Sequence, residues 1–111
     1  MELRRVVVTG IGTINPLGHN VEEYFQNLEN GVCGAAPITN FDASQFKVRF
    51  ACEVKNYDWS QYFDRKEVRK YDRFAQFAMV AASEAVGDAA FGDDVNRRRC
   101  GVVWSSGVGG I

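Results

Sequence analysis

The sequence predicts an α/β fold, and three of its features indicate this class. Two short runs rich in valine, residues 4–9 and 100–104, are each followed by a loop that contains several glycines. Between them, apolar residues recur at helical spacing over residues 65–90. Short apolar runs without interruption are typical of strands in parallel sheets, which helices cover on both faces. We therefore expect two buried strands, with the long helix buried between layers.

The first predicted strand, residues 4–9, runs into the loop "GIGTINPLGHN". Gly10 and Gly12 match the start of the fingerprint of dinucleotide-binding domains, in which a helix begins directly after a third small residue. Here Asn15 stands at the third position, Pro16 follows, and helical spacing begins only near Val21. An NAD(P)-dependent oxidoreductase is therefore only a remote alternative.

A first helix is predicted after Asn20, which forms a capping pair with Glu23. Gly31 favours the C-terminal end of this helix. Residues 32–45 are irregular, and residues 46–54 then alternate strictly between two sets of side chains. An alternation of period two predicts a strand with one buried face, formed here by Phe46, Val48, Phe50, Cys52 and Val54.

The long predicted helix opens with another capping pair, Asp64 with Glu67. Its second half is rich in alanine, and such small side chains let a neighbouring segment approach closely. The first two turns of this predicted helix carry a basic stripe, which consists of Lys66, Arg69, Lys70 and Arg73. The basic stripe is either a solvated helix face or a docking surface for an acidic partner, because clustered charge attracts opposite charge over long distances.

Composition excludes several classes of protein. The 13 basic and 14 acidic side chains nearly balance, whereas nucleic-acid-binding domains carry a basic excess. No apolar run approaches the roughly 20 residues that cross a membrane, and no signal peptide is evident, so we expect a cytoplasmic protein. Cys33, Cys52 and Cys100 are far apart in the sequence and His19 is the only histidine, so no metal site is expected.

The predicted strands also bear on domain organisation. Buried parallel strands need neighbours and cover on both faces, and residues 46–54 offer only one strand with a single buried face. We therefore expect residues 1–111 to be the first part of a larger α/β protein. The last loop places Gly107, Gly109 and Gly110 after the second predicted strand, at the end of a strand where α/β proteins put their sites.

Four stretches, in order along the chain, carry a resemblance to a known family. They are "RRVVVTGIGTINPLGHNVEEYFQNLENGVCG", "ITNFDASQFKVRFACEV", "DRKEVRKYDRFAQFAMVAASEAV" and "SSGVGG". The sequence resembles the N-terminal stretch of the β-ketoacyl-acyl-carrier-protein synthases of the type II class, a family of the thiolase fold. The resemblance implies a thiolase-like layered α/β/α/β/α fold, with residues 1–111 as an incomplete, N-terminal segment of the ketosynthase domain.

The resemblance also implies an activity. Enzymes of this family are homodimeric acyltransferases of fatty acid biosynthesis: a cysteine accepts the acyl chain, and condensation with malonyl-acyl-carrier protein releases carbon dioxide. The family's nucleophilic cysteine and its two histidines are expected outside residues 1–111, and Cys33, Cys52, Cys100 and His19 match none of them. No metal or organic cofactor is implied, because the phosphopantetheine arm arrives on the carrier protein.

Few positions of this chain match functional positions of the family. Val108 matches a position that places a side chain against the acyl pocket, and an aliphatic residue there favours the type II class. Ser105 departs mildly from the family pattern, which leaves the local conformation of the last loop open. Two alternatives of the same fold also stay open: a polyketide ketosynthase, and a non-catalytic chain-length partner subunit without the nucleophile. The residues that match the family's docking site for the acidic carrier protein are Lys66, Arg69 and Lys70.

Overall fold

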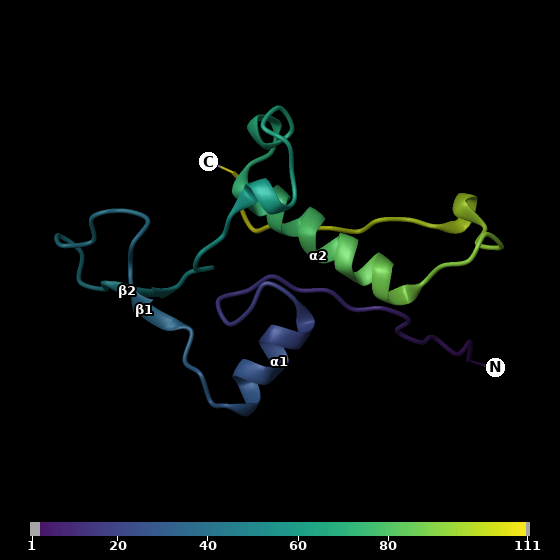
Figure 1. The fold of residues 1–111 in the computed structure, drawn as a ribbon, viewed down its shortest axis with the longest axis horizontal. Helices are drawn as coiled ribbons and strands as arrows, with labels where there is room; N and C mark the ends of the chain where they lie inside the picture. The colour runs from purple at the N-terminus through teal and green to yellow at the C-terminus, as the bar shows by residue number, and fades with distance from the viewer. Residues whose placement is uncertain (1–2, 111) are drawn as a thin grey trace.

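The structure, a computed structural model, describes residues 3–110. Figure 1 shows the longest helix, α2, in the middle of the molecule, with the N-terminal and C-terminal segments running along it on opposite sides in this view. Helix α1 and a small hairpin lie to one side of α2. The elements, in chain order, are α1 (Val21–Glu29), β1 (Ala35–Pro37), β2 (Phe50–Cys52), the 3-10 helices η1 (Trp59–Gln61) and η2 (Val68–Lys70), α2 (Arg73–Ala89) and η3 (Arg97–Arg99).

Helix α1 begins and ends where the sequence predicts. The side chain of Asn20 accepts the N–H of Glu23 at 2.8 Å, and the Glu23 carboxylate accepts the N–H of His19 at 2.7 Å. This is the reciprocal arrangement of a capping box, displaced by one residue on the return bond. After the helix, Gly31 takes a φ of +66°, which only glycine adopts without a penalty. The predicted capping pair and C-terminal stop are both confirmed.

The hairpin is shorter and more exposed than the alternation in residues 46–54 predicts. Strands β1 and β2 pair antiparallel over three residues each, with Ala35 opposite Cys52 and Pro37 opposite Phe50. Phe50 is 65% exposed, so the prediction of a buried apolar face on this strand is wrong for the described residues. The reason is that no layer of residues 3–110 covers this face. The base of the hairpin is fixed instead by Glu53, whose carboxylate accepts the N–H and hydroxyl of Thr39.

The prediction of one continuous helix over residues 65–90 is confirmed only for α2, because residues 65–70 form a turn and the 3-10 helix η2. Tyr71 is extended, with φ −119° and ψ 125°, and separates η2 from α2. A side-chain network lies at this junction: the buried Gln76 donates from Nε2 to the carbonyl of Tyr71 at 2.8 Å and accepts the hydroxyl of Tyr57 at 3.0 Å. These bonds stabilise the extended backbone that precedes α2. The basic stripe therefore does not lie on two turns of one helix.

Both predictions of buried strands, at residues 4–9 and 100–104, are wrong within the described part of the chain. Neither segment is assigned as a strand, and Val6 and Val103 are 90% and 98% exposed. A strand needs a hydrogen-bonded neighbour and cover for its side chains, and residues 3–110 supply neither for these segments. Apolar side chains that the sequence marks as core are consequently left open.

The overall dimensions agree with this exposure. The accessible surface is 9620 Å², whereas a folded protein of this mass exposes about 6,100 Å². The radius of gyration is 17.5 Å, against about 13 Å for a compact domain of this length. The buried residues among the described ones are few and lie mainly on α2: Gly18, Ala43, Gln76, Val80 and Ala81. Helix α2 and the first loop are therefore the best-packed part of the structure. The segments around them have apolar side chains that nothing in residues 3–110 covers.

Candidate functional site

The first loop lies directly on α2, and its glycines make this contact possible. A Cβ atom at Gly12 would clash with the carbonyl oxygen of Ala81, and one at Gly10 would clash with that of Ala85. The alanines of α2 are the small side chains that the sequence predicts for close approach. The two glycines therefore serve a backbone-to-helix contact.

Two carboxylates of α2 hold the loop in this position. Glu84 accepts the N–H of Thr13 with one oxygen and the N–H of Val21 with the other, both at 2.8 Å. One turn further along, Asp88 accepts the N–H of Ile11 at 3.0 Å. These bonds are not predicted from the sequence. The available signal was a pair of acids four residues apart on an alanine-rich helix that faces a glycine pair.

The same bonds argue against a dinucleotide site in the first loop. In dinucleotide-binding domains the pyrophosphate lies at a helix N-terminus, where free N–H groups point at it. Here the N–H of Val21, the first residue of α1, already bonds the Glu84 carboxylate. A fixed negative charge thus occupies the place of the phosphate. The oxidoreductase alternative loses its basis.

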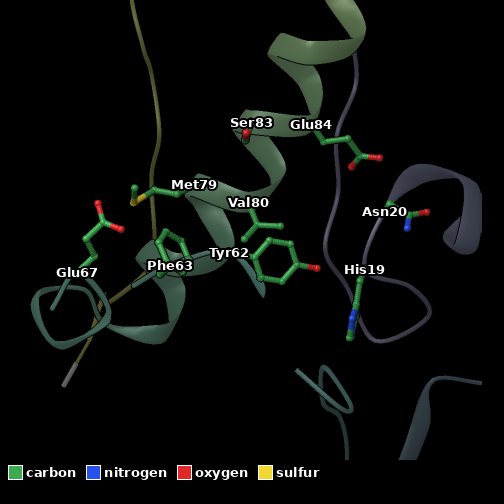
Figure 2. A pocket seen from close by; sticks show the side chains of 9 residues that line it. All are labelled: His19, Asn20, Tyr62, Phe63, Glu67, Met79, Val80, Ser83 and Glu84. Carbon is green, nitrogen blue, oxygen red and sulfur yellow. The ribbon is translucent and has the colours of Figure 1, made fainter. Parts of the chain in front are cut away.

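A cavity of about 500 Å³ lies between the first loop, α2 and the segment that follows η1. Figure 2 shows His19 and Asn20 on one wall, Tyr62 and Phe63 across from them, and Val80 behind. The lining carries two carboxylates, Glu67 and Glu84, and no lysine or arginine, so its charge does not suit an anion.

The imidazole and the two carboxylates of this cavity bond backbone groups. His19 Nε2 lies 2.7 Å from the carbonyl oxygen of Lys55, and since a carbonyl only accepts, Nε2 carries the proton. Both oxygens of Glu84 accept backbone N–H groups, and Glu67 accepts the N–H of Asp64. This lining positions backbone segments, and it forms no nucleophile–base pair among the bonds of the described residues.

The predicted docking residues lie in and beside η2 and are exposed. Lys66 belongs to the turn before η2, while Arg69 and Lys70 belong to η2 itself. Asp64 fixes this turn, because its side chain accepts the N–H groups of Lys66 and Glu67, each at 2.7 Å. The backbone of this turn is thus braced by hydrogen bonds, while the three cationic side chains are exposed.

The glycine-rich loop with Val108 returns to the N-terminal end of α2. A Cβ atom at Gly110 would clash with the Asp72 carboxylate, and one at Gly109 would lie 3.8 Å from the ring of Phe74. Val108 itself is 75% exposed. Lys70 is two residues from Asp72, so the structure brings the predicted docking turn and the predicted acyl-pocket loop to the same end of one helix.

A smaller cavity, of about 330 Å³, lies over α2 between the first loop and the last segment. Ile14, Phe77, Trp104 and Ser105 are among its lining residues, and Val108 is not. Within the described residues, Val108 therefore does not line this cavity. Among residues 3–110, no group of three or more side chains could hold a metal ion, and no helix is long and apolar enough to cross a membrane.

Comparison with known proteins gives one consistent family. Residues 3–110 match the family described as the N-terminal domain of beta-ketoacyl synthases. The whole chain is 44% identical to 27% of the 3-oxoacyl-[acyl-carrier-protein] synthase 2 of Synechocystis, and 45% identical to 27% of the protein of that name from Coxiella burnetii. The chain therefore spans about a quarter of the length of these curated relatives.

A solved structure is also similar. The ishigamide ketosynthase/chain length factor matches 82% of this chain and 23% of its own, with a TM-score of 0.71 and 41% sequence identity. Sequence and structure comparisons thus agree over most of the chain.

Proposed function

Because the chain belongs to the β-ketoacyl synthase family, whose N-terminal domain matches residues 3–110, we propose that the protein containing it elongates fatty acyl chains. The match to a ketosynthase structure confirms the predicted thiolase-like α/β fold. One observation carries the proposal: the whole chain is 44% identical to a protein named 3-oxoacyl-[acyl-carrier-protein] synthase 2. Residues 1–111 are then an N-terminal segment of a larger ketosynthase domain, which accounts for their uncovered apolar side chains.

The proposed reaction has two steps. A cysteine thiol outside this chain displaces the carrier thiol from acyl-carrier protein, which forms an enzyme thioester. Malonyl-carrier protein then loses carbon dioxide, and the resulting carbanion attacks the thioester. The products are 3-oxoacyl-carrier protein and the free enzyme thiol, so the chain grows by two carbons. No metal or organic cofactor takes part.

The proposed partner is an acidic acyl carrier protein that docks on Lys66, Arg69 and Lys70. Support comes from the exposure of these cations on a turn that Asp64 fixes. Further support comes from the contact between Asp72 and Gly110, which brings the loop of Val108 close to the docking turn. We propose that Val108 limits the acyl pocket of the complete protein. We also propose a cytoplasmic homodimer, as the family resemblance implies.

The direct test is condensation by the complete protein. The protein is incubated with acyl-carrier protein and malonyl-carrier protein, and mass spectrometry follows the carrier-bound products. We expect 3-oxoacyl-carrier protein together with an acylated enzyme cysteine, one carbon dioxide being released per product. An enzyme that forms neither the thioester nor the product contradicts the proposal.

A second candidate is a non-catalytic chain-length partner subunit. The similar solved structure favours it, because that structure is of a ketosynthase/chain length factor. This candidate predicts no acylated cysteine in the isolated protein and condensation only after a catalytic subunit is added. A polyketide ketosynthase would instead accept its own 3-oxoacyl products for repeated condensation without reduction of the 3-oxo group.

A further inference from the structure

The first loop and the start of α1, residues 11–21, form a strap across α2. Three N–H groups of the strap donate to carboxylates of α2: Ile11 to Asp88, and Thr13 and Val21 to Glu84. The two bonds to Glu84 are partly buried, whereas the bond to Asp88 is exposed. Bonds to an ionised acceptor are the stronger class of hydrogen bond, and burial strengthens them further.

The middle of the strap is braced by its own bonds. The backbone groups of Asn15 and Gly18 bond each other at 2.9 and 3.2 Å. The side chain of Asn15 accepts the N–H of Leu17, whose carbonyl accepts the side chain of Asn27 on α1. These bonds fix the shape of the turn and tie it to α1, so its position on α2 depends on the bonds made at its two ends.

His19 carries the position of the strap to a third segment. It follows the braced turn directly, and its ring donates to the carbonyl of Lys55, which lies after β2. His19 also lines the 500 Å³ cavity together with Glu84. The path of bonds therefore runs from α2 through the strap to the segment after the hairpin.

We propose that Glu84 is the positioning residue that holds this path together. It is the group that bonds both ends of the braced turn, since Thr13 precedes the turn and Val21 follows it. Loss of its carboxylate releases the turn at both ends, moves His19 and opens one wall of the cavity. Loss of Asp88 releases only the outer end of the strap.

The first test compares Glu84→Gln with Asp88→Asn in the complete protein by hydrogen exchange. Each substitution is nearly isosteric and removes one negative charge, so the pair is matched. We expect Glu84→Gln to raise exchange in residues 11–20 by about tenfold or more, and Asp88→Asn to raise it much less. An equal effect of the two variants, or a rise that is uniform over the protein, overturns the proposal.

The second test removes a donor and leaves Glu84 intact. Val21 is the first residue of α1, where proline is tolerated because its missing N–H has no helical partner. The preceding Asn20 has φ −153° and ψ 172°, an extended conformation that a following proline permits. Val21→Pro should therefore keep the helix and remove one of the two Glu84 bonds. It should loosen the strap without any change in charge.

The two variants are then combined. If Glu84 acts through Val21, Glu84→Gln should raise strap exchange by a smaller factor in the Val21→Pro background than in the native protein. Effects that simply multiply contradict the proposal. As a readout of position, the Nε2–H proton of His19 should exchange with solvent faster in Glu84→Gln, because its bond to the Lys55 carbonyl is lost, as seen by NMR of the imidazole with His19→Gln used for assignment. An unchanged exchange rate of this proton overturns the proposed path, and if Glu84→Gln does not fold, Val21→Pro alone decides.

Discussion

Gly10 and Gly12 determine how closely the first segment of the chain meets α2. Each lies where an added Cβ atom would clash with a backbone carbonyl of the helix. A helix carbonyl cannot move aside without loss of a hydrogen bond, so an added Cβ atom could not be accommodated without a cost in free energy. Their role is a close packing of two backbones, which is a different use of glycine from the turn of a nucleotide-binding loop.

Gly12→Ala should destabilise the complete protein by about 1–3 kcal/mol, because the methyl group overpacks the contact with Ala81. Gly87 provides the control, since an added Cβ there meets nothing within 4 Å outside its own helix. Gly87→Ala should stabilise the protein by about 0.4–1 kcal/mol. Chemical denaturation measures the free energy of unfolding of both variants. Equal effects of the two substitutions would show that the first loop does not press on α2.

In the proposed function, the size of the Val108 side chain limits which acyl chains the complete protein accepts. Val108→Phe should reduce condensation of long acyl groups more than that of short ones, because a larger side chain fills the far end of a pocket first. The comparison of kcat/KM for the two substrate lengths measures this, with Val108→Ala as the control that enlarges the space. A loss that is equal for short and long chains would remove Val108 from the pocket.

At the scale of elements, the junction between η2 and α2 depends on the bond from Tyr57 to Gln76. Tyr57→Phe leaves the buried carboxamide oxygen of Gln76 without its donor, which should cost about 1–3 kcal/mol. Burial, followed by the nearby Tyr62, raises the pKa of Tyr57. Its contribution to stability is therefore complete below the ordinary tyrosine pKa of about 10 and is lost as pH rises through the higher folded value.

The measurement is the difference in unfolding free energy between native protein and Tyr57→Phe at several pH values. The difference should be constant from pH about 7 to 9 and should shrink above about 10. Other tyrosines titrate in both proteins and cancel. A difference that grows with pH would mean that the phenolate, not the phenol, is the favoured form in the fold.

The docking turn is an element whose charge can be tested against a matched surface. Replacing Lys66, Arg69 and Lys70 with glutamate should weaken binding of the carrier protein by about tenfold or more at low salt, and by less at high salt. The same replacement of Arg97, Arg98 and Arg99 in η3 changes the net charge equally at the far end of α2. Calorimetric titration at two salt concentrations compares the variants. If both triple variants bind equally weakly, net charge and not the docking turn governs recognition.

At the scale of the whole molecule, the uncovered apolar side chains are the main feature. The surface exceeds that of a compact domain of equal mass by about half, and the valines of both predicted strands face solvent. Burial of apolar surface is the largest favourable contribution to folding, so residues 3–110 alone have little to stabilise them. This agrees with the proposal that they belong to a larger ketosynthase domain.

Residues 1–111 produced alone should therefore bind a hydrophobic dye and unfold without a sharp transition, as loosely packed chains do. The complete protein should bind little dye and unfold cooperatively. Scattering, dye fluorescence and calorimetry on both proteins give the comparison. A cooperative transition and a radius of gyration near 13 Å for residues 1–111 alone would show that they form an independent domain.

The sequence by itself determined the features that depend on close neighbours along the chain, and it determined the family. The cap formed by Asn20 and Glu23 and the stop at Gly31 are satisfied within a few residues, so they survive in any surroundings. The ordered motifs identified a β-ketoacyl synthase, and the family match over residues 3–110 confirms it. The alanine-rich stretch also predicted close approach correctly.

Only the tertiary structure decided the features whose partners lie far away in the sequence. The junction before α2 involves the bond between Gln76 and Tyr57, which are 19 residues apart. The position of the first loop depends on Glu84, whose partners are 63 and 71 residues away. Helical periodicity contains no signal for either bond. The valine runs show that the same dependence on distant partners applies to strands. A run of residues can favour a strand, but the strand forms only where a neighbour pairs with its backbone and covers its side chains.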